Sequence, residues 1–356
     1  MVLHRAGVGG MTRRSAVAAV ILGALAAGCG GGSHHRSSAT TVASVAPAPP
    51  PKKRPASAAA APPVQALVTA ETENRLLVVD LPSGRVVRRL AIANDPEDVA
   101  ANSGACSSVV VTSAAAGKVT VLDRETLRPR KVIGGFGTPH IAEIAPGGAY
   151  AYVTDDARGT VTVIYLGDPR VTSTIEVGAS AHHLSFDPAH HLAWVALGET
   201  ARTIVILSTA DLAHPRVIGR FDPGFPAHDI EFSPNGQQAW VTSADNPEVS
   251  VFGAVDHRIQ FRVPVGTGPQ HVAFAGHVAY LTSGYGGVIE QADASTGRVD
   301  RRASSPYGSF ELDAGQGYVV ASSLLRGTLA IYDPALKLLH VVHLAPAARE
   351  VAISTD

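Results

Sequence analysis

Residues 139–165, PHIAEIAPGGAYAYVTDDARGTVTVIY, contain three short runs rich in β-branched and aromatic residues. The first follows Pro139 and ends in a Pro-Gly-Gly turn, the second is 152–154, and the third is the alternating stretch 161–165. Short runs of this kind, separated by Gly, Pro, Asn and Asp, are typical of antiparallel strands joined by tight turns. The segment therefore predicts a meander of β-strands.

The central run of this segment recurs along the chain at a nearly constant interval. It consists of an aromatic or apolar residue, then Val or Leu, then a small residue, and its copies begin at residues 67, 110, 152, 194, 240, 280 and 318. A strand led by Pro or a small residue precedes the copies, and an alternating strand follows each one. Four short strands in a repeat of about 42 residues are typical of β-propeller blades. We therefore predict an all-β fold, a seven-bladed β-propeller of four-stranded antiparallel blades.

The two ends of the repeat region are complementary. The first copy, at residue 67, lacks the preceding strand, whereas residues 348–354 form such a strand with no copy after it. A C-terminal strand that joins the N-terminal blade would close the ring and protect its edges. We expect this closure, and with it one propeller domain over residues 64–356.

The run Tyr152, Val153, Thr154 and Asp155 resembles the signature of the YVTN β-propeller repeat family of bacterial exported proteins, and the Ser-Pro-Asn-Gly turn at 233–236 is similar to the usual turn of that family. The resemblance covers residues 64–356 and implies the same seven-bladed fold. It leaves activity open, because family members include binding and surface proteins, and related seven-bladed propellers include lactonases and a copper-cluster reductase. A shared fold does not fix a function.

Residues 1–63 differ in composition from the rest of the chain. Arg13 and Arg14 precede an apolar run, 16–27, and the sequence Leu-Ala-Ala-Gly-Cys ends at Cys29. This pattern is typical of an export signal, and its end resembles a lipobox, whose cysteine becomes the lipidated first residue. We expect a signal peptide over 1–29 and a disordered Ala-, Pro- and Ser-rich tether over 30–63. The chain would then be a lipoprotein held by Cys29 on the outer face of the cytoplasmic membrane; the alternative is secretion.

Charge limits the partners of the repeat region. Residues 1–63 contain seven Lys and Arg and no acidic residue, so residues 64–356 carry 22 basic and 30 acidic side chains. An acidic surface repels phosphate backbones, and nucleic acid is therefore not expected as a partner. We expect a monomer that binds an unidentified small molecule or protein.

In a propeller, the loops that enter the innermost strands meet at one end of the central channel. Aligning the repeats gives two successive positions at this entrance, which we name the first and second rungs. The predicted first rung comprises Glu97, His140, His182, His228, Gln270, Gly308 and Arg349. The predicted second rung comprises Asp98, Ile141, His183, Asp229, His271, Ser309 and Glu350. Five of these 14 positions are His, although the whole chain has only 15, and this enrichment needs a cause.

The leading interpretation is a non-enzymatic binding or scaffold protein whose ligand contacts the ionisable residues of the two rungs. These candidates are Glu97, Asp98, His140, His182, His183, His228, Asp229, His271, Arg349 and Glu350. A hydrated channel with no ligand would also tolerate such residues.

Two alternatives use the same entrance. The first is a metal-binding protein, because neutral imidazole and carboxylate suit a divalent transition metal such as zinc, copper, iron or nickel. The candidate ligands are His140, His182, His183, His228 and His271. The second alternative is a lactonase-like hydrolase in which a histidine acts as general base and Arg349 stabilises an oxyanion. In that case the catalytic residues remain unassigned.

Overall fold

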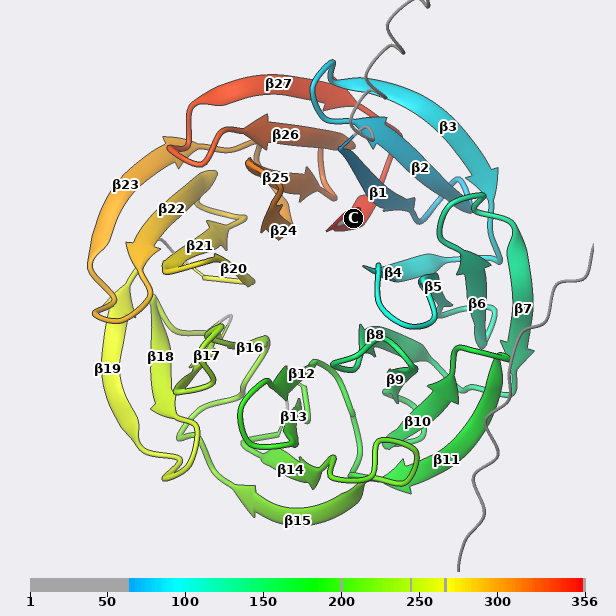
Figure 1. Cartoon of the computed structure of the whole chain (residues 1–356). Helices are drawn as coiled ribbons and strands as arrows, with labels where there is room; N and C mark the ends of the chain where they lie inside the picture. Colours follow the sequence, from blue (N-terminus) through cyan, green and yellow to red (C-terminus); the bar gives the residue numbers. More distant parts are fainter. Residues whose placement is uncertain (1–63, 199–200, 244, 266–267, 355–356) are drawn as a thin grey trace, which may run out of the picture. The chain divides into compact units, whose positions relative to one another are not determined.

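The computed structural model describes residues 64–198, 201–243, 245–265 and 268–354. These residues form 28 β-strands and no helix, arranged as seven four-stranded antiparallel sheets around a common axis (Figure 1). The predicted fold class is confirmed. No helix able to span a membrane occurs in the described ranges. The predicted signal peptide and tether, residues 1–63, lie outside the described residues.

Each blade contributes one strand to each of four concentric positions, counted outward from the channel. The innermost strands are β28 (Ala348–Ile353), β4 (Pro96–Asn102), β8 (Pro139–Ile144), β12 (Leu184–Asp187), β16 (Ile230–Phe232), β20 (Val272–Ala275) and β24 (Ser309–Gly315). The second strands are β1 (Gln65–Ala70), β5 (Ser108–Ser113), β9 (Tyr150–Asp155), β13 (Leu192–Ala196), β17 (Gln238–Val241), β21 (Val278–Ser283) and β25 (Tyr318–Ser323).

The two outer positions complete the blades. The third strands are β2 (Arg75–Asp80), β6 (Lys118–Asp123), β10 (Thr160–Tyr165), β14 (Ile204–Ser208), β18 (Glu248–Gly253), β22 (Val288–Asp293) and β26 (Thr328–Tyr332). The outermost strands are β3 (Arg85–Ala91), β7 (Pro129–Gly134), β11 (Arg170–Glu176), β15 (Arg216–Phe221), β19 (Ile259–Pro264), β23 (Val299–Ser304) and β27 (Leu338–His343).

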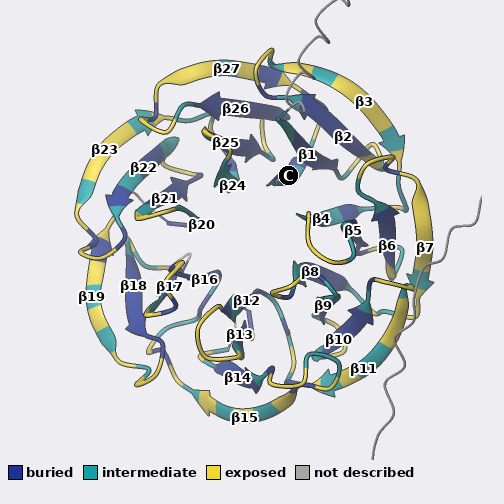
Figure 2. Ribbon diagram, viewed as in Figure 1, coloured by how far each residue is buried: buried dark blue, intermediate teal, exposed yellow. Residues whose placement is uncertain are grey.

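The second and third strands supply most of the core. Both of their faces pack against neighbouring blades, and β5 is buried along its whole length. The outermost strands are mostly exposed or half-buried (Figure 2). The buried apolar residues form seven clusters, and each cluster combines residues from two adjacent blades. Stability therefore depends on contacts between blades around the complete ring, as in other repeat proteins.

The C-terminal strand closes the ring. Strand β28 pairs antiparallel with β1, with Ala66 opposite Ile353 and Val68 opposite Val351. The same strand places Val351 and Ile353 in the apolar cluster between the first and last blades. Closure by the C-terminus is thus confirmed. The seven blades and their apolar clusters together form one closed ring.

Candidate metal centre

The small third residue of the repeated motif positions the channel entrance. Thr112 lies in the second strand of its blade, and its hydroxyl accepts a hydrogen bond from the backbone N–H of Asp98 at 3.0 Å. The same hydroxyl donates to the carbonyl of His140, in the next blade, at 2.6 Å. Thr242 repeats the arrangement with Asp229 and Gln270. The motif therefore links the entrance residues of one blade to those of the next.

The sequence prediction is wrong in the blade that contains β24. Thr282 donates to the carbonyl of Phe310, 28 residues later, which is the same offset as from Thr112 to His140. Ser309 pairs with Ser323 as Pro96 pairs with Ser113. The first- and second-rung residues of this blade are therefore Phe310 and Glu311, two positions after the predicted Gly308 and Ser309. The last motif copy is correspondingly 320–322.

The five predicted histidines come together at the mouth of the channel, and we call them the mouth histidines: His140, His182, His183, His228 and His271. Two sets of three have ligand atoms within 4.8 Å of one another, one being His140, His182 and His183, the other His183, His228 and His271. The rings of His140 and His182 stack with centroids 3.9 Å apart. His183 belongs to both sets and is the centre of the cluster.

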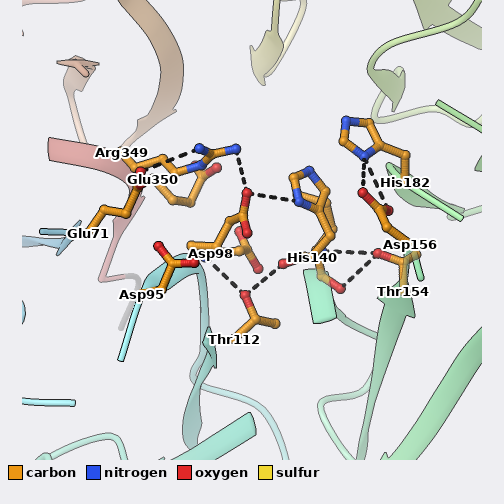
Figure 3. Close-up of polar contacts among 12 residues, drawn as sticks. Glu71, Asp95, Asp98, Thr112, His140, Thr154, Asp156, His182, Arg349 and Glu350 are labelled. Atoms are coloured by element: carbon orange, nitrogen blue, oxygen red, sulfur yellow. Dashed lines mark hydrogen bonds and ion pairs between the residues drawn. The ribbon is translucent and has the colours of Figure 1, made fainter. Parts of the chain in front are cut away.

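Four of these imidazoles meet a carboxylate through Nδ1. The Nδ1 atom of His140 lies 3.1 Å from Glu97, and that of His182 lies 3.1 Å from Asp156 (Figure 3). The Nδ1 atom of His183 lies 3.4 Å from Asp229, and that of His271 lies 2.9 Å from Glu311. In metal sites, such carboxylates orient the ring and leave Nε2 for the ion. The Nε2 atom of His271 is buried and has no hydrogen-bond partner.

Burial favours the neutral form of three of the mouth histidines, His140, His183 and His271. It lowers the pKa of His140, against the opposing effect of its hydrogen bond with Glu97. Burial, together with the neighbouring imidazoles, holds the pKa of His183 well below its usual value, and burial lowers the pKa of His271 to about 4. A neutral imidazole has the free lone pair that a metal ion requires.

Arg349 is neutralised by carboxylates. Its guanidinium lies 2.6 Å from Glu97 and 3.5 Å from Glu71 (Figure 3). Burial raises the pKa of Glu97, but the hydrogen bond with His140 and the charge of Arg349 outweigh this, so the pKa lies below its usual value. Arg349 thus pairs with Glu71 and Glu97, and Glu97 in turn contacts the His140 imidazole. The guanidinium is thus already engaged and is a poor candidate for stabilising a substrate oxyanion.

Below the mouth lies a cavity of about 320 Å³ lined by carboxyl groups. Burial raises the pKa of these groups; that of Glu231 rises to about 8, and those of Glu143 and Glu350 rise well above the usual value. We call this set the inner carboxyls: Asp98, Glu143, Asp229, Glu231, Asp313 and Glu350.

Five site residues escaped the sequence analysis: Glu143, Asp156, Glu231, Glu311 and Asp313. Three of them, Glu143, Glu231 and Asp313, lie two positions after the second rung as the structure defines it. Strand alternation could have placed Glu143 and Glu231 on the channel face. The offset of about 28 residues from Thr or Ser could have found Glu311. Asp156 lies in the loop between β9 and β10, for which the repeat pattern gave no signal.

No family profile and no curated protein matches this chain. Several solved structures share its fold. A functionally unknown protein from Desulfotomaculum acetoxidans aligns with a TM-score of 0.70 and 16% identity over 82% of this chain and 98% of that one. Kuenenia stuttgartiensis hydrazine synthase aligns with a TM-score of 0.65 and 15% identity over 76% of this chain and 92% of that one. Apo AztD from Citrobacter koseri aligns with a TM-score of 0.61 and 10% identity over 83% of this chain and 99% of that one. At these identities the likeness shows the fold alone, a seven-bladed β-propeller.

Proposed function

We propose that this protein binds a divalent transition-metal ion through the mouth histidines. The carrying observation is the presence of two overlapping sets of three imidazoles whose ligand atoms lie within 4.8 Å. Three imidazoles with one further position are a common ligand set for zinc. Nitrogens bound tetrahedrally at 2.0–2.1 Å would be about 3.3 Å apart, so the rings would close by roughly 1.5 Å on binding. Rotation of side chains at the open mouth can supply such a movement.

The surrounding charge supports a cation rather than an anion. Asp156, Asp229 and Glu311 contact mouth histidines directly, and Glu97 does so while also binding Arg349. Apart from Arg349, no cationic side chain pairs with these carboxylates in the described residues. Burial raises the pKa of Asp229 and raises that of Glu311 to about 8. A divalent ion bound to the neighbouring imidazoles would favour the ionised forms of these carboxyls and offset their charge. Imidazole without thiolate favours zinc, copper(II) or nickel over soft monovalent ions.

The metal-binding proposal narrows the binding-scaffold interpretation to one ligand class, divalent transition-metal ions.

We further propose that the chain is an exported lipoprotein of the YVTN type, anchored by Cys29 on the outer face of the cytoplasmic membrane. The support is the signal-like and lipobox-like sequence of residues 1–29. Membrane fractionation tests this, because Cys29→Ala should release the protein from the membrane fraction. Continued co-sedimentation of the variant with membranes would contradict the anchor.

Metal retention tests the site. A protein comprising residues 64–356 is stripped with a chelator, incubated separately with zinc, copper(II) or nickel salts, and passed through gel filtration before metal analysis. We expect about one retained ion per chain. A His182→Ala, His228→Ala double variant should retain none, because neither set keeps three imidazoles. The matched control is His214→Ala with His277→Ala, which removes two exposed histidines outside the mouth. Absence of retained metal in the wild type would refute the proposal.

A further inference from the structure

The channel mouth is chemically asymmetric. In the first rung, as the structure defines it, six residues are polar or charged and one is apolar, Phe310. The Phe310 ring packs edge-on against Tyr285, with centroids 5.0 Å apart. Tyr285 in turn lies 6.1 Å from Tyr307, and these tyrosines are 59% and 46% exposed. An aromatic patch therefore reaches the mouth at the junction of the blades that contain β20 and β24, beside the otherwise polar first rung.

A second cavity, of about 90 Å³, lies between this patch and the histidines. Its lining combines His228, which belongs to one imidazole set, with Glu311, which holds His271 of the same set. Phe310 and Leu324 provide its apolar wall. The volume corresponds to about three water molecules, enough for a small planar ring.

The contacts in and around this cavity define the ligand that it would accept. Three imidazoles leave the fourth position of a tetrahedral ion open. Arg349 also lines the cavity, but its guanidinium already forms ion pairs with Glu97 and Glu71. Burial raises the pKa of Glu311 to about 8, so this carboxyl is mostly uncharged near pH 7. An anion entering the cavity would lose its hydration and would find no free cation among the lining residues to balance its charge. A neutral donor ring instead finds apolar contact on one side.

We propose that the His183–His228–His271 set forms an open metal centre whose fourth ligand is a neutral nitrogen-donor heterocycle of azole size, seated in the cavity against Phe310. This inference rests on the proposed metal function and names the exogenous ligand class of that site. The same chemistry could come from a free azole or from the histidine side chain of a partner protein. The aromatic patch lies where the backbone of a partner would lie.

Cobalt(II) substitution tests this inference, because the visible spectrum of cobalt changes when a ligand enters its coordination sphere. The cobalt-loaded protein, residues 64–356, is titrated with 4-methylimidazole, with acetate, and with a short peptide containing one histidine. We expect a saturable spectral change with 4-methylimidazole at concentrations at least tenfold lower than with acetate. Phe310→Ala should weaken azole binding about fivefold, through the loss of apolar contact.

Leu325→Ala provides the matched control, since Leu325 is 52% exposed beside the patch but does not line the cavity. An unchanged azole affinity in this variant, with peptide affinity no higher than that of the free azole, would identify a free heterocycle as the source. A peptide that binds more tightly than the azole and is weakened by both variants would identify a partner histidine.

The two proposals fail separately. If cobalt does not bind, the metal function itself is wrong. If cobalt binds and no probe changes its spectrum, the coordination sphere is closed and the open-site inference is wrong. An equal response to acetate and azole, with no effect of Phe310→Ala, would overturn the assignment of a neutral ring.

Discussion

The mouth histidines and the inner carboxyls lie in the innermost strands or immediately before them, yet burial shifts the pKa values of His271 and Glu231 in opposite directions. Burial lowers the pKa of His271 to about 4 and raises that of Glu231 to about 8. Both groups are therefore neutral near pH 7, but only the imidazole then offers a lone pair suited to a transition metal. The comparison shows that a low-dielectric channel prepares histidines for metal binding and leaves carboxyl groups holding protons.

Removal of β28 opens the ring that holds both the mouth histidines and the inner carboxyls, and it should cause the greatest loss of stability. Deletion of residues 346–356 removes Arg349 and Glu350 from the channel and exposes the strand edge of β1. Loss of the buried Val351 and Ile353 side chains alone costs about 3–6 kcal/mol, which is comparable to the stability of a whole domain. We expect no cooperative thermal unfolding by circular dichroism. A variant lacking only residues 355–356 is the control, and an unchanged midpoint in the longer deletion would contradict ring closure.

Glu231→Gln sharpens the comparison on the carboxyl side. The folded-state pKa of Glu231 is about 8, above its ordinary 4.5, so its protonated form stabilises the fold fully below pH 4.5. That stability falls as pH rises and is lost through pH 8, by about 5 kcal/mol in total. The Gln variant cannot ionise, so its free energy of unfolding should fall less between pH 5 and pH 8.5.

Urea unfolding at these two pH values measures the difference between wild type and the Glu231→Gln variant. Glu248→Gln is the matched control, because Glu248 forms an exposed pair with Arg262 and lies outside the channel. If Glu231→Gln and Glu248→Gln show the same pH dependence as the wild type, Glu231 does not hold a proton in the folded state.

His183→Ala sharpens the comparison on the histidine side. His183 is the member shared by both imidazole sets, so its removal leaves neither with three ligands. We expect at least a hundredfold loss of zinc affinity in competition with a chromogenic chelator. His182→Ala should lose less than tenfold, because the set containing His228 and His271 stays complete. Equal losses in the two variants would show that both sets are needed together.

Asp156→Asn should give the smallest of these effects. The carboxylate orients His182 through Nδ1 at 3.1 Å. Because it acts only through His182, its loss should weaken zinc binding less than His182→Ala does, and therefore by less than tenfold. Asp211→Asn is the matched control, since Asp211 and His214 form a similar pair, at 3.2 Å, outside the channel. Zinc titration by calorimetry measures both variants. A greater loss in Asp211→Asn would indicate a metal site away from the mouth.

The number of blades, the closure by residues near the C-terminus and the convergence of five histidines could all be predicted from the amino-acid sequence. These follow from periodicity, because each repeat has the same local pattern of strands and turns and so places equivalent residues at equivalent points of the ring. A single repeat with a weak motif, Val320 to Ser322, was enough to displace the predicted rung and hide Glu311.

The pairing of each carboxylate with its imidazole could not be predicted from the sequence and became visible in the folded ring. The contacts of Asp156 with His182 and of Glu311 with His271 join different blades, and no spacing along one strand encodes them. The structure likewise decided that the pKa values of the inner carboxyls are raised, because this shift depends on burial by the whole ring rather than on neighbouring residues in the chain. The repeat places ionisable residues at the channel, and packing between blades determines their contacts and pKa values.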